Sequence, residues 1–431
     1  MMTAAIFAVL VILIMLGFPI ALCMGLTAAI FFVVLGEVDT LLMLPARMYS
    51  SSTSFTLLAI PFFILVGNVM NTGGMTMRIF RLAQCMVGHI KGGLGHVNVV
   101  NSMIFAGMSG SAVADAAGIG MVELEAMVKA GFSRRFSAAV TAATSTIGPV
   151  IPPSIPFVIF GSMTGTSVGR LFLGGFIPGV IMGLAMMVLC SYYARVRNYP
   201  RQKRATMGQI WHALVTTFPS LLTPVIIIGG IWTGFFTPTE ASAVSTIYAM
   251  FVALFIYREM TLKKLFQIAI ESGLVTAKIM IIIASSGVFV WILTVGGIPE
   301  MVNGWVNSAG ASQFMVLMLI NIVFLIAGMF LEPNSVLVVL TPLFYPIATG
   351  LGVNPVHLGI ILVLNISIGM YTPPFGFNIF VTMSIFRTPM KKIVEGLMPF
   401  IIVSLIALFI TTYVPELTLW LPKQLYPKSF P

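Results

Sequence analysis

The chain alternates between long, predominantly apolar stretches and short polar connections. Such stretches cover residues 4–17, 20–35, 214–230 and 401–410, and several approach the length of about 20 residues that a helix needs to cross a bilayer. The alternating segments of about ten residues that are typical of membrane β-barrels are absent from the sequence. The pattern therefore predicts an all-α integral membrane protein with about a dozen apolar segments.

Composition supports this interpretation. Hydrophobic residues make up 58% of the 431 and charged residues 8%, whereas a soluble domain has about 45–50% and about 25%. We attribute the net charge of +10 to the positive-inside bias of membrane proteins and expect no nucleic-acid partner. The first 25 residues lack the basic segment of a signal peptide, so we expect a retained helix there. The three Cys and four His are scattered, which predicts neither a disulfide nor a metal cluster.

The sequence contains an internal repeat at a constant offset of 221 residues. The tripeptide at 106–108 recurs at 327–329, and the Pro-Pro pair at 152–153 recurs at 373–374. A constant register over about 70 residues, which includes a rare Pro-Pro pair, favours two copies of one unit. Each copy predicts membrane helices, a short amphipathic arm (75–90 and 298–311), a hairpin with a polar tip and a helix broken by proline.

The predicted boundaries follow from this repeat. They are 1–195 for the first repeat, with its hairpin at 94–130 and its broken helix at 137–163; 196–212 for a cytoplasmic linker; 213–415 for the second repeat, with its hairpin at 313–350 and its broken helix at 358–384; and 416–431 for a C-terminal tail. Within the second repeat, Thr237-Pro238-Thr239-Glu240 predicts a capping box that starts a helix.

Charge along the loops predicts the topology. If each hairpin is re-entrant, each repeat crosses the membrane five times, and an odd number inverts the second copy. With the N-terminus outside, the inner loops 74–93, 129–137, 258–264 and 386–392 hold three Lys or Arg each and 195–212 holds five, together 17 of the 22. The outer loops between helices hold only Arg47 and Arg170. This partition favours both the hairpins and the inversion.

Four polar breaks interrupt the apolar segments at the hairpin tips and at the Pro-Pro pairs. They are 109–111, 148–153, 331–335 and 369–374. Backbone that is not helical at membrane depth is tolerated only where protein or a water-filled cavity satisfies it. Because proline bars helical geometry before it, each Pro-Pro pair frees carbonyl oxygens, which suit Na⁺, while restarting helices offer N–H groups to an anion. The arrangement is typical of a secondary transporter.

Each hairpin carries an acid at or near its tip. Asp115 lies four residues after Ser111, so both side chains share one helix face, and Glu332 lies in the matching tip. Intramembrane acids are costly and indicate function, which here favours a coupled cation. The alternatives are that the Ser and Gly residues only pack helices, that Pro-Pro only kinks them, and that Asp115 only organises the hairpin.

The motifs GMSGSAVADAAGIG, IGPVIPPSIPF, FTPTEASAV, GMFLEPNSVLVVLTPLFYPI and IGMYTPPFGFNIF resemble the large membrane subunit of TRAP (tripartite ATP-independent periplasmic) transporters, the DctM-like family. The resemblance covers essentially the whole chain. One departure is Glu332, where the family is expected to have Asp, so coordination there could differ.

The resemblance implies an elevator-type, sodium-driven importer of organic acids, such as C4-dicarboxylates or sialic acid, in the bacterial inner membrane, with the N-terminus in the periplasm. The implied partners are a small four-helix membrane subunit and a periplasmic substrate-binding protein. The only implied cofactor is co-transported sodium, with no organic cofactor.

The resemblance also implies the site residues. One sodium site would comprise Ser109, Gly110, Ser111, Ser145, Gly148, Pro149 and Val150, supported by Asp115, and the other Glu332, Asn334, Ser335, Ser367, Gly369 and Thr372. Substrate would lie near Ser109, Ser111, Ser154 and Asn378.

Three alternatives remain. A stand-alone divalent-anion/sodium symporter would share the hairpins but need no binding protein. An intramembrane serine protease would need His96 to activate Ser109 or Ser111, and an aspartyl protease would need a second intramembrane Asp, whereas Asp39 lies in a predicted loop. A channel suits two inverted units with closed tips less well than alternating access does. We therefore expect a transporter and not an enzyme.

Overall fold

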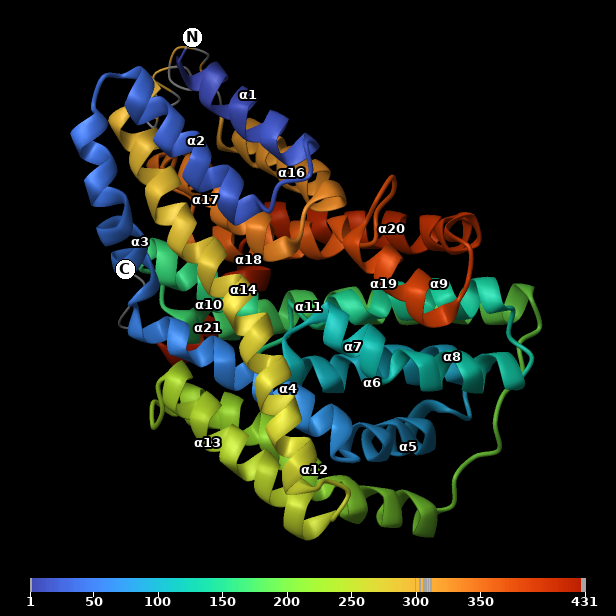
Figure 1. Ribbon diagram of the computed structural model, residues 1–431. Coiled ribbons are helices and arrows are strands. Elements are labelled where there is room, and N and C mark those ends of the chain that lie inside the picture. Colours follow the sequence, from blue (N-terminus) through green and yellow to red (C-terminus); the bar gives the residue numbers. More distant parts are fainter. Residues whose placement is uncertain are drawn as a thin grey trace.

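The described part of the chain is entirely helical. The computed structural model describes residues 2–427 apart from 299, 302–303, 305–307, 309 and 311, and these described residues contain no β-strand. Figure 1 shows a bundle in which one long helix, α14, runs diagonally across the molecule. The predicted all-α fold is therefore confirmed.

Helices of the first half follow the predicted order. They are α1 (Met2–Met15), α2 (Ile20–Val34), α3 (Leu44–Ser52), α4 (Ala59–Thr72), α5 (Met75–Val87), α6 (Gly93–Ser109), α7 (Ala112–Gly118), α8 (Gly120–Lys129), α9 (Arg134–Thr144), α10 (Ile155–Thr164) and α11 (Val168–Val196), with short 3₁₀ turns at Val38–Met43, Phe55–Leu58 and Ser145–Ile147.

Helices of the second half repeat this order. They are α12 (Met207–Trp232), α13 (Pro238–Phe251) with a π-helical extension at Val252–Ile256, α14 (Leu262–Val295), α16 (Gln313–Phe330), α17 (Pro333–Gly350), α18 (Pro355–Gly369), α19 (Phe377–Phe386), α20 (Met390–Tyr413) and α21 (Glu416–Leu425). Most of the predicted arm at 298–311 lies outside the described residues.

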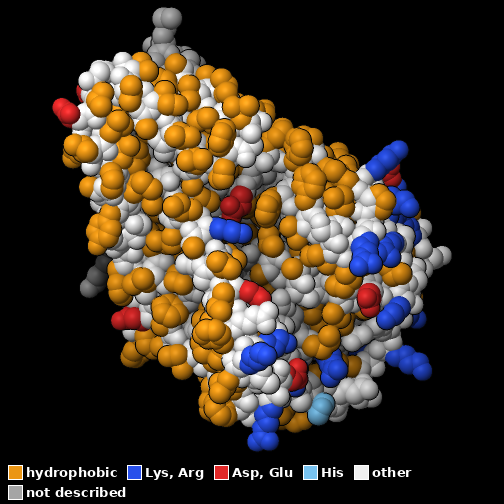
Figure 2. Space-filling model, in the orientation of Figure 1, with side chains coloured by type: hydrophobic (Ala, Val, Ile, Leu, Met, Phe, Trp, Pro, Cys, Tyr) orange, Lys and Arg blue, Asp and Glu red, His pale blue; other side chains and the backbone are white. Residues whose placement is uncertain are grey.

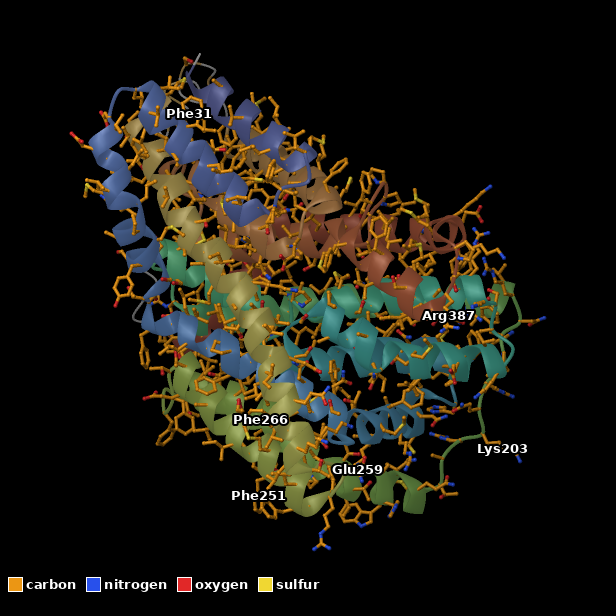
Figure 3. All side chains as sticks on the ribbon, viewed as in Figure 1. Phe31, Lys203, Phe251, Glu259, Phe266 and Arg387 are labelled. Atoms are coloured by element: carbon orange, nitrogen blue, oxygen red, sulfur yellow. The ribbon has the colours of Figure 1, made fainter. Side chains whose placement is uncertain are left out.

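The surface is that of a membrane protein. In the described residues, seven helices are long and apolar enough to span a bilayer by length and composition, and five further apolar helices are shorter. Apolar side chains cover most of the visible face, and charged side chains gather towards its lower right (Figure 2). Lys203 and Arg387 lie towards that end of the molecule and Phe31 lies at the opposite end (Figure 3). We call this charged end the basic face.

Long helices of the two halves form a framework around the hairpins. Helix α14 contacts α2, α3, α4 and α17, and α13 contacts α4. The arm helix α5 is fixed to this framework because Arg78 bonds Glu259 at 2.7 Å and stacks over the ring of Tyr257. The sequence-remote segments around residues 78 and 257 are thereby joined.

The two hairpins point towards each other. The first, α6 to α8, opens to the right of Figure 1, whereas the second, α16 and α17, opens to the upper left, so both tips point towards the interior of the bundle. Each tip faces a helix that is broken at a Pro-Pro pair: α9 and α10 flank 152–153, and α18 and α19 flank 373–374. The fold thus has two copies of one unit in opposite orientation, each with a re-entrant hairpin and a broken helix.

The structure differs from prediction at two connections. The last six residues of the predicted linker are helical, because Thr206 and Gln209 form a capping box that starts α12 at Met207. The predicted tail contains helix α21, which packs on α11 and α18, and its Thr418 hydroxyl lies 2.8 Å from Nδ1 of His357. The predicted capping box at Thr237 and Glu240 is confirmed.

Candidate functional site

The first hairpin tip is a glycine turn between two serines. Helix α6 ends at Gly110, whose φ of +60° lies in the left-handed region, and Ser111 is extended and caps α7 by accepting the N–H of Ala114. The N–H of Ser111 in turn points at Oγ of Ser109, 3.4 Å away. A methyl group on Gly110 would lie 2.5 Å from the carbonyl oxygen of Pro153, so this turn fits against the Pro-Pro stretch only as glycine.

The facing helix is broken between Ser145 and Ile155. After a 3₁₀ turn at Ser145–Ile147 the backbone is irregular until α10 begins. Ser154 caps α10 by accepting the N–H of Phe157, while its own hydroxyl donates to the carbonyl of Pro149 at 2.5 Å. A Cβ on Gly148 would lie 3.3 Å from the carbonyl carbon of Ser111. The residues predicted for the first ion site therefore come together from two elements.

Asn378 of the second repeat reaches this same site. Its amide donates to the hydroxyl of Ser145 and to the carbonyl of Ala142, both at 2.8 Å, while its Oδ1 is buried without a hydrogen-bond partner among the described residues. Helix α19, which carries Asn378, also contacts α7 behind the first tip. The two repeats thus share one polar centre. The sequence analysis grouped Asn378 with the serines of the first repeat, but it did not predict the bond from Asn378 to Ser145.

The second tip has different chemistry. Leu331 is extended, Glu332 precedes Pro333 at the start of α17, and the amide of Asn334 donates to the Glu332 carboxylate at 3.0 Å. The remaining amide oxygen of Asn334 and the hydroxyl of Ser335 are buried without a hydrogen-bond partner among the described residues. Three oxygen-bearing groups are thus gathered at the start of one helix, and two of them are unsatisfied among the described residues.

The second broken helix packs closely against this hairpin. A Cβ on Gly369 would lie 2.8 Å from the backbone of Gly328, and the N–H of Gly376 donates to the carbonyl of Met329 at 2.8 Å. The hydroxyls of Ser367 and Thr372 each donate to a carbonyl four residues earlier at 2.7 Å, which leaves their lone pairs free to accept or to coordinate. Within the described chain, no hydrogen bond joins these hydroxyls to Glu332.

Asp115 faces the inside of the first hairpin and not its tip. Asp115 is 1% exposed and lies beside Ser102 of α6, and neither of its carboxylate oxygens has a hydrogen bond of normal geometry to any described residue. Its electrostatic neighbour is Glu123 of α8, also buried, which receives the amide of Asn101 at 2.7 Å. No side-chain bond joins Asp115 to Ser109 or Ser111 in the described residues, so its grouping with the tip stays a prediction.

Sequence reasoning missed Glu123 and Asn101. The available signal was an acid eight residues after Asp115 inside the same predicted hairpin, because a spacing of eight leaves two side chains about 80° apart, within one broad face of a helix. The spacing alone was ambiguous, since the return arm is split into α7 and α8 at Ile119. Two buried acids, three of whose oxygens have no hydrogen-bond partner among the described residues, form an electronegative cluster inside the hairpin, which a cation or protons would have to offset.

The protease alternative does not fit the geometry. Nε2 of His96 lies 3.2 Å from the hydroxyl of Ser191, and His96 is 13 residues before Ser109 on the same helix, about 20 Å away along its axis. A histidine at that distance cannot take a proton from Ser109 or Ser111. Likewise, the described residues contain no group of three or more His, Cys, Asp or Glu side chains that could bind a metal ion.

Comparison with known proteins identifies the family. The family described as "Tripartite ATP-independent periplasmic transporter, DctM component" matches residues 7–417. The C4-dicarboxylate TRAP transporter large permease protein DctM of Pseudomonas aeruginosa is 41% identical over 402 residues, which are 93% of this chain and 94% of that protein. The sialic acid TRAP transporter large permease protein SiaM of Vibrio cholerae is 38% identical over 377 residues, 88% of each chain.

A solved structure shares the fold. The YdaH transporter of Alcanivorax borkumensis, described as having an unusual topology, superposes with a TM-score of 0.67 over 90% of each chain at 11% identity. Both sequence relatives are named as permease proteins, so this protein is a transporter subunit and not an enzyme. The match over nearly all of its length shows that the chain belongs to the DctM family of TRAP transporter large permeases.

Proposed function

We propose that this permease imports a small organic acid, such as a C4-dicarboxylate or sialic acid, by coupling its movement to that of sodium ions. The observation that carries the proposal is the shared polar centre, where the first tip, the first Pro-Pro break and Asn378 of the opposite repeat meet. Inverted repeats with broken helices place substrate and ions at such a midpoint. The substrates named for the two relatives are both anions, which supports an acid as the cargo.

The first sodium ion would be held by the first tip and its facing break. The ligands would be drawn from Ser109, Gly110 and Ser111 and from Ser145, Gly148, Pro149 and Val150, since hydroxyl and carbonyl oxygens are the ligands that hard cations prefer. Asp115 and Glu123 would contribute negative charge from within the hairpin. The second ion would be held by Glu332, Asn334 and Ser335 with Ser367, Gly369 and Thr372.

The acid itself would lie between the tips. Ser109, Ser111 and Asn378 would bind it, and the buried, unpartnered Oδ1 of Asn378 is available for a substrate hydroxyl. Ser154 would act differently from its predicted role. Because its hydroxyl hydrogen is directed at Pro149, it would hold that carbonyl in place rather than donate to substrate.

The proposal includes the surroundings of the site. The basic face would be cytoplasmic and the N-terminus periplasmic, in a bacterial inner membrane. The repeats would comprise 1–195 and 213–415, with the hairpins and broken helices moving as an elevator against the framework helices. A separate small four-helix subunit and a periplasmic binding protein would complete the system.

Uptake into proteoliposomes tests the proposal. The chain would be reconstituted with its small subunit and binding protein, with or without an inward sodium gradient, and supplied with radiolabelled succinate or N-acetylneuraminate. We expect uptake that requires both the gradient and the binding protein. Uptake by this chain alone would contradict the tripartite arrangement, and uptake without sodium would contradict the coupling.

A further inference from the structure

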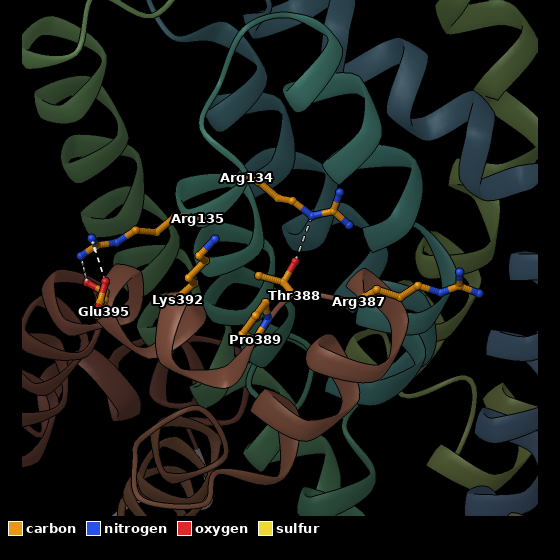
Figure 4. A pocket seen from close by; sticks show the side chains of 7 residues that line it. All are labelled: Arg134, Arg135, Arg387, Thr388, Pro389, Lys392 and Glu395. Carbon is orange, nitrogen blue, oxygen red and sulfur yellow. Dashed lines mark hydrogen bonds and ion pairs between the residues drawn. The ribbon is translucent and has the colours of Figure 1, made fainter.

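A basic pocket opens on the basic face between the two repeats. It has a volume of about 580 Å³ and lies where the start of α9 meets the connection between α19 and α20 (Figure 4). Four of its lining residues are Arg or Lys and one is acidic, so the pocket has a net charge of +3. A volume of this size suits a small organic molecule.

Two of the four cations already have partners within the protein: Arg134 through hydrogen bonds and Arg135 through an ion pair. Arg134 donates to the carbonyl of Phe386 and, at 3.1 Å, to the hydroxyl of Thr388, so it fixes the end of α19. Arg135 pairs with Glu395 of α20 through the carboxylate at 3.0 Å and the backbone carbonyl at 2.8 Å. These contacts join α9 to the second repeat. Glu395, the only acid that lines the pocket among the described residues, is therefore already neutralised by Arg135.

Two further cations remain unpaired. In the described part of the chain, neither Arg387 nor Lys392 has an ion pair or a side-chain hydrogen bond, and both are exposed. Lys392 projects between Arg134 and Arg135, and the Arg387 side chain lies on the other side of Thr388 (Figure 4). The first turn of α20 adds its positive helix end to the same place, and Pro389 at its N-cap offers no side-chain cap to neutralise it.

The fold itself does not demand this charge. At the offset of 221 residues, the counterparts of Arg134 and Arg135 are Pro355 and Val356, and those of Arg387 and Lys392 are Thr166 and Leu171. The same junction in the other repeat is therefore built without these cations. The positive-inside rule explains why basic residues lie on this face but not why they surround a hollow.

The pocket also lies at one end of the helices that lead to the polar centre. Helix α9 runs ten residues from Arg134 to Thr144, next to Ser145, and α19 runs nine residues from Asn378 to Arg387. At about 1.5 Å per residue, both distances are about 15 Å. The pocket therefore lies about 15 Å from the polar centre along both helices, on the basic side of the molecule.

We propose that the pocket is a second, low-affinity anion site that receives the carboxylate of the transported acid as it leaves on the cytoplasmic side, with Arg387 and Lys392 as its main contacts. The inference rests on the proposed function for its cargo and direction. A cationic hollow raises the local concentration of anions, and it binds them in a manner that salt screens. The site would therefore set how the permease responds to acid already inside the cell.

Exchange transport tests the inference. Proteoliposomes containing the complete complex would be loaded with increasing unlabelled acid, succinate or N-acetylneuraminate, and the entry of external labelled acid would be measured. In the double variant Arg387→Gln/Lys392→Gln, we expect the internal concentration for half-maximal exchange to rise about tenfold, while the external value is unchanged. The control is Lys263→Gln/Lys264→Gln, which removes two exposed charges from the first turn of α14 outside the pocket.

Two results would overturn the proposal. One is an internal half-saturation that is the same in the pocket variant as in the control. The other is a lipid effect: if the wild type requires phosphatidylglycerol in the liposomes, and the pocket variant loses that requirement without a change in internal half-saturation, the occupant is a lipid phosphate and not the cargo.

A labelling experiment separates this inference from the proposed function. Pro389→Cys, which leaves both cations in place at an exposed lining position, would be made in a Cys85→Ser background, because Cys23 and Cys190 are buried. The variant would be treated with the anionic thiol reagent 2-sulfonatoethyl methanethiosulfonate. Protection of Pro389→Cys by succinate or N-acetylneuraminate, lost when Arg387→Gln/Lys392→Gln is added, would support the pocket even if no uptake is seen. Normal uptake without protection would refute the pocket alone.

Discussion

The two hairpins place their acids differently although they share one architecture. The first has a Ser-Gly-Ser tip with Asp115 and Glu123 buried behind it, whereas the second has Glu332 at the tip itself. At the offset of 221 residues, Val336 and Phe344 replace the two buried acids of the first hairpin, and both are buried. Apolar residues thus fill these positions in one hairpin, so packing does not require carboxylates in the other.

The tips also turn in different ways. The first uses left-handed Gly110, and its return arm is divided at Ile119, whereas the second turns through extended Leu331 and returns as the single helix α17 of 18 residues. A divided return arm lets α7 and α8 take different directions around the buried acids. We infer that the first hairpin is built around an internal polar cluster and the second around its tip.

The largest expected effect on uptake is at Glu332. Under the proposed function, Glu332→Gln removes the only acid of the second ion site, and we expect uptake at limiting sodium to fall about a hundredfold, equivalent to about 2.7 kcal/mol. Glu332→Asp is the matched control, because it keeps the charge on a shorter arm and should retain most activity. Initial uptake rates measured across a sodium series check this. A Glu332→Gln variant with the sodium dependence of the wild type would remove Glu332 from the site.

Gly110→Ala tests the turn of the first tip. The new methyl group would lie 2.5 Å from the Pro153 carbonyl oxygen, and alanine resists the left-handed conformation, so we expect a loss of about 2–4 kcal/mol. The control is Gly131→Ala, which has a φ of +93° but no atom within 4 Å of the new methyl group. The temperature of thermal unfolding of the purified complex should fall clearly more in Gly110→Ala than in Gly131→Ala. Equal losses would mean that backbone conformation alone, and not the contact with Pro153, restrains the tip.

Much of this comparison could be predicted from the sequence. Proline and glycine report local backbone geometry directly, so the breaks at Pro152-Pro153 and Pro373-Pro374 and the turn at Gly110 were predicted in place. The repeat offset then predicted which segments correspond. Helix α21 was missed because its short, mixed sequence carries no membrane-length signal, and its packing on α11 depends on tertiary contacts.

The polar contacts were less predictable. The bond from Asn378 to Ser145 joins residues 233 positions apart, and no local pattern encodes such a separation. The direction of the Asp115 side chain was also hidden, because the spacing to Ser111 is compatible with either face of the hairpin. Residue type identified most candidate positions, but only the fold shows that Asp115 and Glu123 are close enough to interact electrostatically.

The buried acids of the first hairpin give an intermediate effect. If their charge supports a bound cation, Asp115→Asn and Glu123→Gln should each weaken sodium binding about tenfold. Sodium-dependent thermal stabilisation of the complex measures this, because a ligand that binds only the folded state raises its stability. The control is Glu125→Gln, an exposed acid on α8 that pairs with Lys129 at 3.5 Å. If both buried variants respond to sodium as the control does, the acids organise the hairpin and hold no ion.

The smallest expected effect on transport comes from comparing two asparagines of the second broken helix, Asn378 of α19 and Asn365 of α18. Asn378→Ala removes the amide that donates to the Ser145 hydroxyl and to the Ala142 carbonyl, and Asn365→Ala removes the amide that donates to the Asn321 side chain and to the Ile361 carbonyl. Each change should therefore cost about 1–3 kcal/mol of stability. Only Asn378 lies at the shared polar centre. We therefore expect Asn378→Ala alone to raise the external half-saturating concentration of the acid, by about threefold, at unchanged sodium dependence. If Asn365→Ala raises it equally, substrate affinity follows the stability of the bundle, and the contact between the repeats carries no specific role in binding.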